Sequence, residues 1–120
     1  DYPEPWVLWA LLWLQSASAI ANVYLRLDQR RWPNARTRPE RLRAGGRTLV
    51  HHGAGLAAAL LFVVLHQAPP LVIVAFAVTF VDAVDTVRRP WPGARPARIG
   101  VRQLIVTTIF VAVMVLAYLV

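Results

Sequence analysis

The sequence predicts an all-α fold, an integral membrane helical bundle with four transmembrane helices. Four long apolar stretches are almost free of charge, and two arginine-rich segments separate them. The stretches cover about residues 6–27, 49–65, 71–87 and 101–120. Each is close to the length that a helix needs to cross a hydrocarbon layer of ~30 Å. They lack the alternation of barrel strands, and a bilayer admits only helices or closed barrels. We therefore expect residues 1–120 to form a single transmembrane domain.

The composition agrees with a membrane location. Apolar residues make up 58 % of the chain and charged residues 16 %, whereas soluble domains carry about 25 % charged residues. Cysteine is absent, which excludes disulfides, thiolate catalysis and Cys-ligated metals. The sequence leaves both cofactors and metal binding undetermined.

The first apolar stretch has two different ends. Pro3 and Pro5 precede it and suit the start of a helix. Three tryptophans at helical spacing predict an aromatic anchor at the membrane surface. They are Trp6, Trp9 and Trp13. The other half carries small and weakly polar residues, which usually mark a face packed against a neighbouring helix. The polar ones are Gln15, Ser16, Ser18 and Asn22.

The segment 28–48 is expected to be a loop. Pro33 and Pro39 should break any long helix, and Gly45–Gly46 should form a turn before the second apolar stretch. That stretch begins with His51 and His52 and then becomes a smooth run of Ala, Leu and Val.

The last two apolar stretches flank the segment 88–100, which is expected to be a second loop. The third stretch follows the double proline of a tight turn at 67–70 and is uniformly apolar until Asp82 and Asp85. The fourth contains only Thr107 and Thr108 as polar residues in its central part.

The net charge of +7 comes from thirteen arginines, with no lysine. Eight lie between Arg26 and Arg47 and five between Arg88 and Arg102. In a four-span chain both groups fall on the same side, and the positive-inside rule makes that side cytoplasmic. Both termini, including Asp1 and Glu4, are then external. We expect membrane lipids as partners and no nucleic acid, since these charges suit anionic head groups. Arginine in place of lysine is typical of GC-rich bacterial genomes, which indicates a bacterial cell membrane.

An external start without a signal segment favours a C-terminal fragment of a longer protein. Further transmembrane helices of that protein would then be partners of this chain.

Asp82 and Asp85 are the most suggestive chemical pair. Three residues apart, they share one face of a helix near its cytoplasmic end. Intramembrane carboxylates usually face a bundle interior or a water-filled cavity. They could hold a divalent cation or relay a proton. They could equally form ion pairs with Arg88 and Arg89, which follow at helical spacing.

The histidines carry a weaker signal. His51 and His52 are adjacent and point about 100° apart on a helix, so one regular helix cannot present both to one ion. No other metal-ligand spacing accompanies them. A polar tip at the head-group boundary is the simpler interpretation, and His66 at the outer turn receives the same one.

Asn22, then Asp28, then Arg36–Thr37–Arg38–Pro39 resembles the polyprenyltransferase superfamily typified by UbiA. That resemblance implies an Asp-rich motif holding magnesium and diphosphate, steadied by an arginine loop. No acidic residue stands between Asn22 and Asp28 here.

A second resemblance covers most of the chain. The chain is similar to the C-terminal portion of YwiC-like membrane proteins in three features. They are the segment VYLRLDQRR, the apolar stretch that begins with histidines, and the segment RPWPGARPARIGVRQ before the last helix. This implies a multi-span bundle and supplies no catalytic residues. The sequence thus predicts a YwiC-like membrane protein with a lipid- or quinone-related role. The alternatives are a degenerate or truncated prenyltransferase acting on an isoprenoid diphosphate, and a component of a proton-coupled transporter. The candidate polar, phosphate or cation site comprises Asn22, Asp28, Arg36, Arg38, His51, His52, Asp82 and Asp85.

Overall fold

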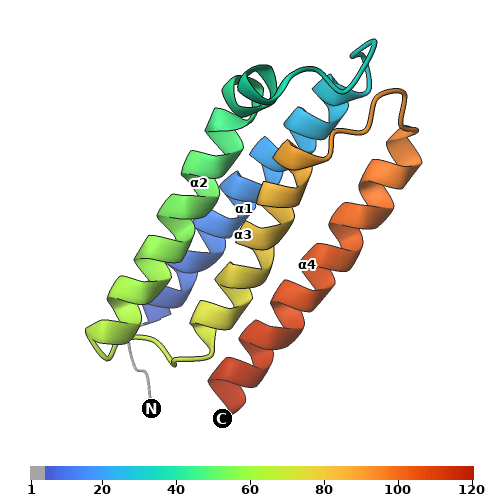
Figure 1. Cartoon of the computed structure of the whole chain (residues 1–120). Helices are drawn as coiled ribbons and strands as arrows, with labels where there is room; N and C mark the ends of the chain where they lie inside the picture. Colours follow the sequence, from blue (N-terminus) through green and yellow to red (C-terminus); the bar gives the residue numbers. More distant parts are fainter. Residues whose placement is uncertain (1–4) are drawn as a thin grey trace.

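A computed structural model describes residues 5–120, and this part of the chain consists of four helices without a strand (Figure 1). The helices are α1 (Pro5–Gln29), α2 (Arg38–Val64), α3 (Val72–Arg88) and α4 (Pro96–Leu119). The predicted all-α fold is confirmed. The expectations for Asp1, Pro3 and Glu4 lie outside the described residues.

Consecutive helices run in opposite directions along a bundle of 51 × 27 × 18 Å (Figure 1). The α1–α2 and α3–α4 connections lie at one end, here called the arginine-rich end, and the α2–α3 turn lies at the other. Helices α1 and α3 each contact the three others, whereas α2 and α4 do not contact each other. Helix α4 therefore lies at the edge of the bundle, beside α3 and α1.

Helices α1, α2 and α4 are long and apolar enough to cross a membrane. At ~1.5 Å rise per residue, their 25, 27 and 24 residues correspond to roughly 36–40 Å. Helix α3 has 17 residues, or about 25 Å at the same rise. Three of the four expected spans are thus found by length and composition.

The distribution of polarity differs from that in a soluble bundle at the outer surface and in part of the interior. Large apolar side chains cover the outside, with Trp9, Val64 and Leu119 at 69, 71 and 77 % exposed. The interior contains polar and charged residues, which soluble proteins mostly keep at the surface. They are Gln15, Ser18, Asn22, Arg26, Gln29, Thr48, His52, Thr79, Asp82 and Thr86. This pattern suits a hydrocarbon surrounding.

Apolar packing holds the end of the bundle opposite the arginines. Buried residues of all four helices meet there, and the rings of Phe76 and Phe110 pack edge to face at 5.2 Å between α3 and α4. The core residues are Val7, Leu11, Ala59, Ala68, Val72, Ala75, Phe76, Phe110, Met114 and Ala117. The arginine-rich end must be held together by other contacts.

The sequence misplaced the start of α2. Instead of a loop over 28–48, the helix begins at Arg38. Thr37 is its N-cap, and its backbone N–H and hydroxyl pair reciprocally with Glu40 in a capping box. Pro39 lies in the first turn, where a missing N–H costs nothing. The expected break at Pro39 is therefore wrong.

The expected turn at Gly45–Gly46 is also wrong, because both glycines lie within α2. Gly45 is buried, and a Cβ at this position would overlap the side chain of Val87 on α3. The glycine is needed for close approach of two helices, not for a turn. Helix α4 likewise begins earlier than expected, with Pro96 in its first turn.

His66 ends α2. It has a positive φ of 59°, and its N–H donates to the Val63 carbonyl at 3.0 Å while Gln67 N–H donates to the Phe62 carbonyl at 2.8 Å. These two bonds form a Schellman motif, which usually has glycine at the position of His66.

Candidate functional site

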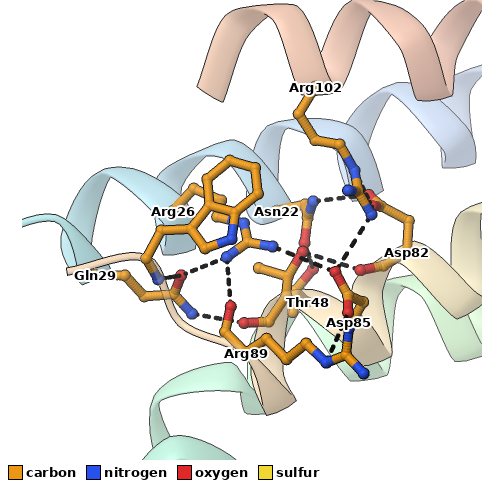
Figure 2. Close-up of polar contacts among 10 residues, drawn as sticks. Asn22, Arg26, Gln29, Thr48, Asp82, Asp85, Arg89 and Arg102 are labelled. Atoms are coloured by element: carbon orange, nitrogen blue, oxygen red, sulfur yellow. Dashed lines mark hydrogen bonds and ion pairs between the residues drawn. The ribbon is translucent and has the colours of Figure 1, made fainter. Parts of the chain in front are cut away.

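Polar side chains from all four helices meet toward the arginine-rich end (Figure 2). We call this group the polar cluster. Its members are Asn22, Arg26 and Gln29 of α1, Thr48 and His52 of α2, Asp82, Asp85 and Thr86 of α3, and Arg102 of α4.

Asp82 is the centre of the polar cluster and is 7 % exposed. Its Oδ1 accepts a hydrogen bond from Nε of Arg102 at 2.9 Å and lies 2.8 Å from Nη2. Its Oδ2 accepts from Nδ2 of Asn22 at 3.3 Å. The Asn22 Oδ1 in turn accepts from the Thr48 hydroxyl at 3.4 Å. One carboxylate thereby links α3 to α4 and to α1, and through Asn22 to α2.

Asp85 shares Arg102 with Asp82. Its Oδ2 lies 3.3 Å from Arg102 Nη2 and 3.7 Å from Arg26 Nη2, and its Oδ1 lies 3.7 Å from Nε of Arg89. Both aspartates thus lie on the same side of α3, next to the guanidinium groups of Arg26, Arg89 and Arg102. Arg89 is a partner at the edge, whereas no ion pair of Arg88 occurs among the described residues.

Arg26 is a buried cation, 2 % exposed. Its guanidinium lies 3.8 Å from the ring centroid of Trp91, a favourable cation–π distance. Its Nη1 donates to Gln29 Oε1 at 3.1 Å and to the Arg89 carbonyl at 2.8 Å. Its Nε and Nη2 have no hydrogen-bond partner in the described part of the chain. The burial of its positive charge is therefore offset otherwise only by the 3.7 Å ion pair with Asp85 and by the Trp91 ring.

Gln29 ties the α3–α4 connection to α1. Its Nε2 donates to the Thr86 carbonyl at 2.7 Å, and its Oε1 accepts from the backbone N–H of Trp91 at 3.3 Å. The Trp91 ring also carries the guanidinium of Arg98, 3.9 Å from its centroid. The connection is thus held by side chains of α1 and α4.

The two histidines at the start of the second apolar stretch lie in different surroundings. His52 is buried, with Nδ1 2.8 Å from the Thr48 carbonyl and 3.2 Å from its hydroxyl. His51 is exposed and contacts the Arg47 carbonyl. The described residues contain no group of three or more histidine, aspartate or glutamate side chains placed to hold a metal ion.

The structure brings only half of the predicted site residues together. Asn22, His52, Asp82 and Asp85 belong to the polar cluster. Outside it, Asp28 accepts a hydrogen bond from Trp32 Nε1 at 3.2 Å, and the guanidinium of Arg36 lies 4.2 Å from the Trp32 ring centroid. Arg38 lines a cavity between α2 and α3.

The sequence did not point to Arg26, Gln29 or Arg102. The two arginines were attributed to membrane topology, and Gln29 was placed in the expected loop. A signal was present in the spacing of the α1 residues. Positions 15, 18, 22, 26 and 29 follow one another by three or four residues, which places them on one helix face. The sequence placed Arg102 at the start of the last apolar stretch. Because α4 begins at Pro96, Arg102 lies roughly one to two turns inside the helix, where it can reach Asp82.

No family model, curated protein or solved structure matches this chain. The fold and site define it as an α-helical bundle with three helices long and apolar enough to cross a membrane, and with a buried polar cluster.

The charges of the polar cluster balance one another. Two arginines (26 and 102) and two aspartates (82 and 85) give it a formal charge of zero. Both oxygens of Asp82 are occupied by donors. A cation at this position would have to displace Arg102 and Asn22. The arrangement suits a clamp between helices.

Proposed function

We propose that this chain is a four-span membrane protein of the YwiC-like type, located in a bacterial cell membrane and with a lipid-related role. Its arginine-rich end would rest on the anionic cytoplasmic leaflet, and the polar cluster would clamp the helices behind it. One observation supports the membrane location: the arginines gather at one end of a bundle on whose outer surface many large apolar side chains are exposed.

The fourth span follows from connectivity. Helix α2 ends at the turn opposite the arginine-rich end, and α4 begins at the arginine-rich end (Figure 1). If α2 and α4 both cross the bilayer, α3 must cross it between them. Its length of about 25 Å is less than the ~30 Å of the hydrocarbon layer. Burial between its neighbours makes this shortness tolerable.

Orientation rests on charge. Short connections rich in arginine are retained in the cytoplasm. Segments 28–48 and 88–100 both lie at the arginine-rich end, and the structure shows that each is partly helical. The α2–α3 turn and the C-terminus are then external.

The geometry favours a clamp over the two alternative functions. A proton-coupled transporter needs a carboxylate that is free to exchange a proton, and both aspartates face guanidinium groups. A prenyltransferase needs carboxylates available to magnesium. The only acidic residue of the UbiA-like pattern, Asp28, bonds Trp32 outside the polar cluster.

The cysteine-free chain allows a direct test of topology. Single cysteines would replace Asn34 and Pro92 at the arginine-rich end and Pro70 at the other end. An impermeant maleimide should label the Pro70→Cys variant in intact cells. The other two variants should react only after permeabilisation. Labelling of cysteines 34 and 92 on opposite sides would contradict the four-span topology.

A second experiment separates the clamp from transport. The Asp82→Asn, Asp85→Asn double variant should insert normally but unfold more readily in detergent. Loss of proton-coupled flux without loss of stability would instead favour the transporter. Magnesium-dependent binding of a polyprenyl diphosphate by the wild-type chain would favour the prenyltransferase.

A further inference from the structure

A cavity of about 660 Å³ lies between the first part of α2 and the last part of α3. One half of its lining is basic and the other half is apolar. The lining residues are Arg38, Arg41, Leu42 and Leu49 of α2 and Val84, Val87, Arg88 and Arg89 at the end of α3. We call it the arginine pocket. It shares no member with the polar cluster, whose arginines are 26 and 102, but adjoins it through Arg89, which pairs with Asp85.

The arginine pocket has excess positive charge. No acidic side chain lines it, and only Arg89 has an ion-pair partner, Asp85, at 3.7 Å. Among the described residues no carboxylate lies within ion-pair distance of Arg38, Arg41 or Arg88. The nearest acidic residue in sequence, Glu40, is engaged by Thr37 in the capping box. Four arginines therefore line the pocket; one of them has an ion-pair partner, and Arg41 Nη1 donates to the Arg36 carbonyl at 2.7 Å.

This site exists because α2 begins at Arg38, earlier than the sequence predicts. Arg38, Arg41 and Leu42 are three and four residues apart, so they share one face of the first turns of α2. Had residues 38–48 formed a loop, these side chains would have no fixed position. Close packing of Gly45 against Val87 sets the distance between the two walls.

The apolar half of the pocket points to an amphiphile and not to a free anion. Leucine and valine side chains lie next to the guanidinium groups, and Leu42 is 48 % exposed. A soluble anion would gain nothing from this wall. A lipid could place its phosphate among the arginines and the first part of its chains against the wall.

We propose that the arginine pocket binds the head group of a phospholipid with two negative charges, and this rests on the proposed membrane location. Guanidinium forks match phosphate oxygens in geometry and charge. Basic pockets between transmembrane helices on the cytoplasmic side are known to hold such head groups. Two negative charges fit a site with three uncompensated guanidinium groups better than one does.

The test compares two double variants that lose the same charge. Arg38→Gln with Arg88→Gln removes two uncompensated arginines of the pocket. Arg31→Gln with Arg95→Gln removes two exposed arginines at the same end, outside the pocket. Neither pair touches the polar cluster. Each protein is purified in neutral detergent, and the rise in melting temperature is followed as phosphatidic acid is added.

We expect phosphatidic acid to raise the melting temperature of the wild type and of the Arg31/Arg95 variant at similar concentrations. The Arg38/Arg88 variant should need roughly tenfold more lipid or more, since each arginine near a membrane surface contributes substantially to anionic lipid binding. Phosphatidylglycerol, with one charge, should act more weakly on the wild type. Inorganic phosphate should have little effect.

Equal loss in both double variants would overturn the site, because general attraction to anionic lipid would then explain the binding. Saturation by inorganic phosphate or by an isoprenoid diphosphate in preference to phosphatidic acid would overturn the lipid assignment. Failure of the membrane proposal would appear elsewhere, in the cysteine labelling, which these variants leave unchanged.

Discussion

Arg102 places both Nε and Nη2 within 2.9 Å of a single oxygen, Oδ1 of Asp82, and so joins the edge helix α4 to α3. Helix α4 does not contact α2; its later half packs in the apolar core through Phe110, Met114 and Ala117, and the Arg102–Asp82 pair joins its first part to α3. The pair therefore determines whether α4 stays in the bundle at the arginine-rich end.

Arg102→Gln should destabilise the bundle. Breaking a buried ion pair costs roughly 3–5 kcal/mol. Because the Arg102 side chain is 40 % exposed, we expect about 2 kcal/mol from the same effect. The measurement is the free energy of unfolding in mixed micelles titrated with a denaturing detergent. Arg95→Gln, at the N-cap position of the same helix, is the control and should change little, because the Arg95 side chain is exposed and makes no cap hydrogen bond. The Arg102→Gln, Asp82→Asn double variant should cost less than the sum of the single changes. Additive costs would show that the two residues do not act as a pair.

Two neighbouring glycines should respond in opposite ways to alanine. Gly45→Ala should destabilise by about 1–3 kcal/mol, because the new methyl overlaps Val87 and forces α2 and α3 apart. Gly46 faces open space, so Gly46→Ala should stabilise the helix by up to ~1 kcal/mol. The same unfolding measurement compares them. Val87→Ala should partly rescue Gly45→Ala, and an equal response of both glycines would refute the close packing.

Arg26→Lys should loosen the α3–α4 connection although it keeps the charge. An ammonium cannot stack on Trp91 while also reaching Gln29 and the Arg89 carbonyl. We expect a loss of about 1–2 kcal/mol and faster amide hydrogen exchange at Trp91 and Gly93, whose N–H groups bond α1. Arg31→Lys, at an exposed position, should leave exchange unchanged. Unaltered exchange in Arg26→Lys would show that charge alone holds the connection.

The capping box at the start of α2 should be sensitive to acid. Hydrogen bonds from the backbone N–H and hydroxyl of Thr37 lower the pKa of Glu40 below its ordinary value of 4.5. The ionised form is thus favoured in the folded chain. Its contribution to stability is fully present above pH 4.5 and is lost as the pH falls through the lowered pKa.

The side-chain carbon shift of Glu40, followed by NMR against pH, should report that lowered midpoint. In Thr37→Ala the hydroxyl bond is lost, and the midpoint should move back toward 4.5. A midpoint in the wild type at or above this ordinary value would mean that the capping box does not form in solution.

Much of the fold was accessible from the sequence because apolar length is a strong signal. The runs that predicted helices do form them, and the polar face expected on α1 is buried at Gln15, Ser18 and Asn22. Ser16 on the same stretch is exposed. Its hydroxyl bonds the Leu12 carbonyl of its own helix.

The helix starts were less accessible, because local composition was overridden by packing. Pro39 and Gly45 are weak helix residues on average, yet one lies in a first turn and the other at a close helix contact. Prediction of the polar cluster required the correct starts of both α2 and α4. Asp82 and Asp85 were recognised as sharing a face, but their partners at positions 26 and 102 are distant in sequence. No spacing rule connects residues on three separate helices.

The cancellation of charge within the polar cluster has an electrical consequence. Moving one elementary charge through a membrane potential involves about 2.3 kcal/mol per 100 mV. Arg26 and Arg102 offset Asp82 and Asp85, so any shift of these four groups as a unit transfers no net charge across the field. In the proposed membrane location, a change in membrane potential should therefore exert little net force on these four groups.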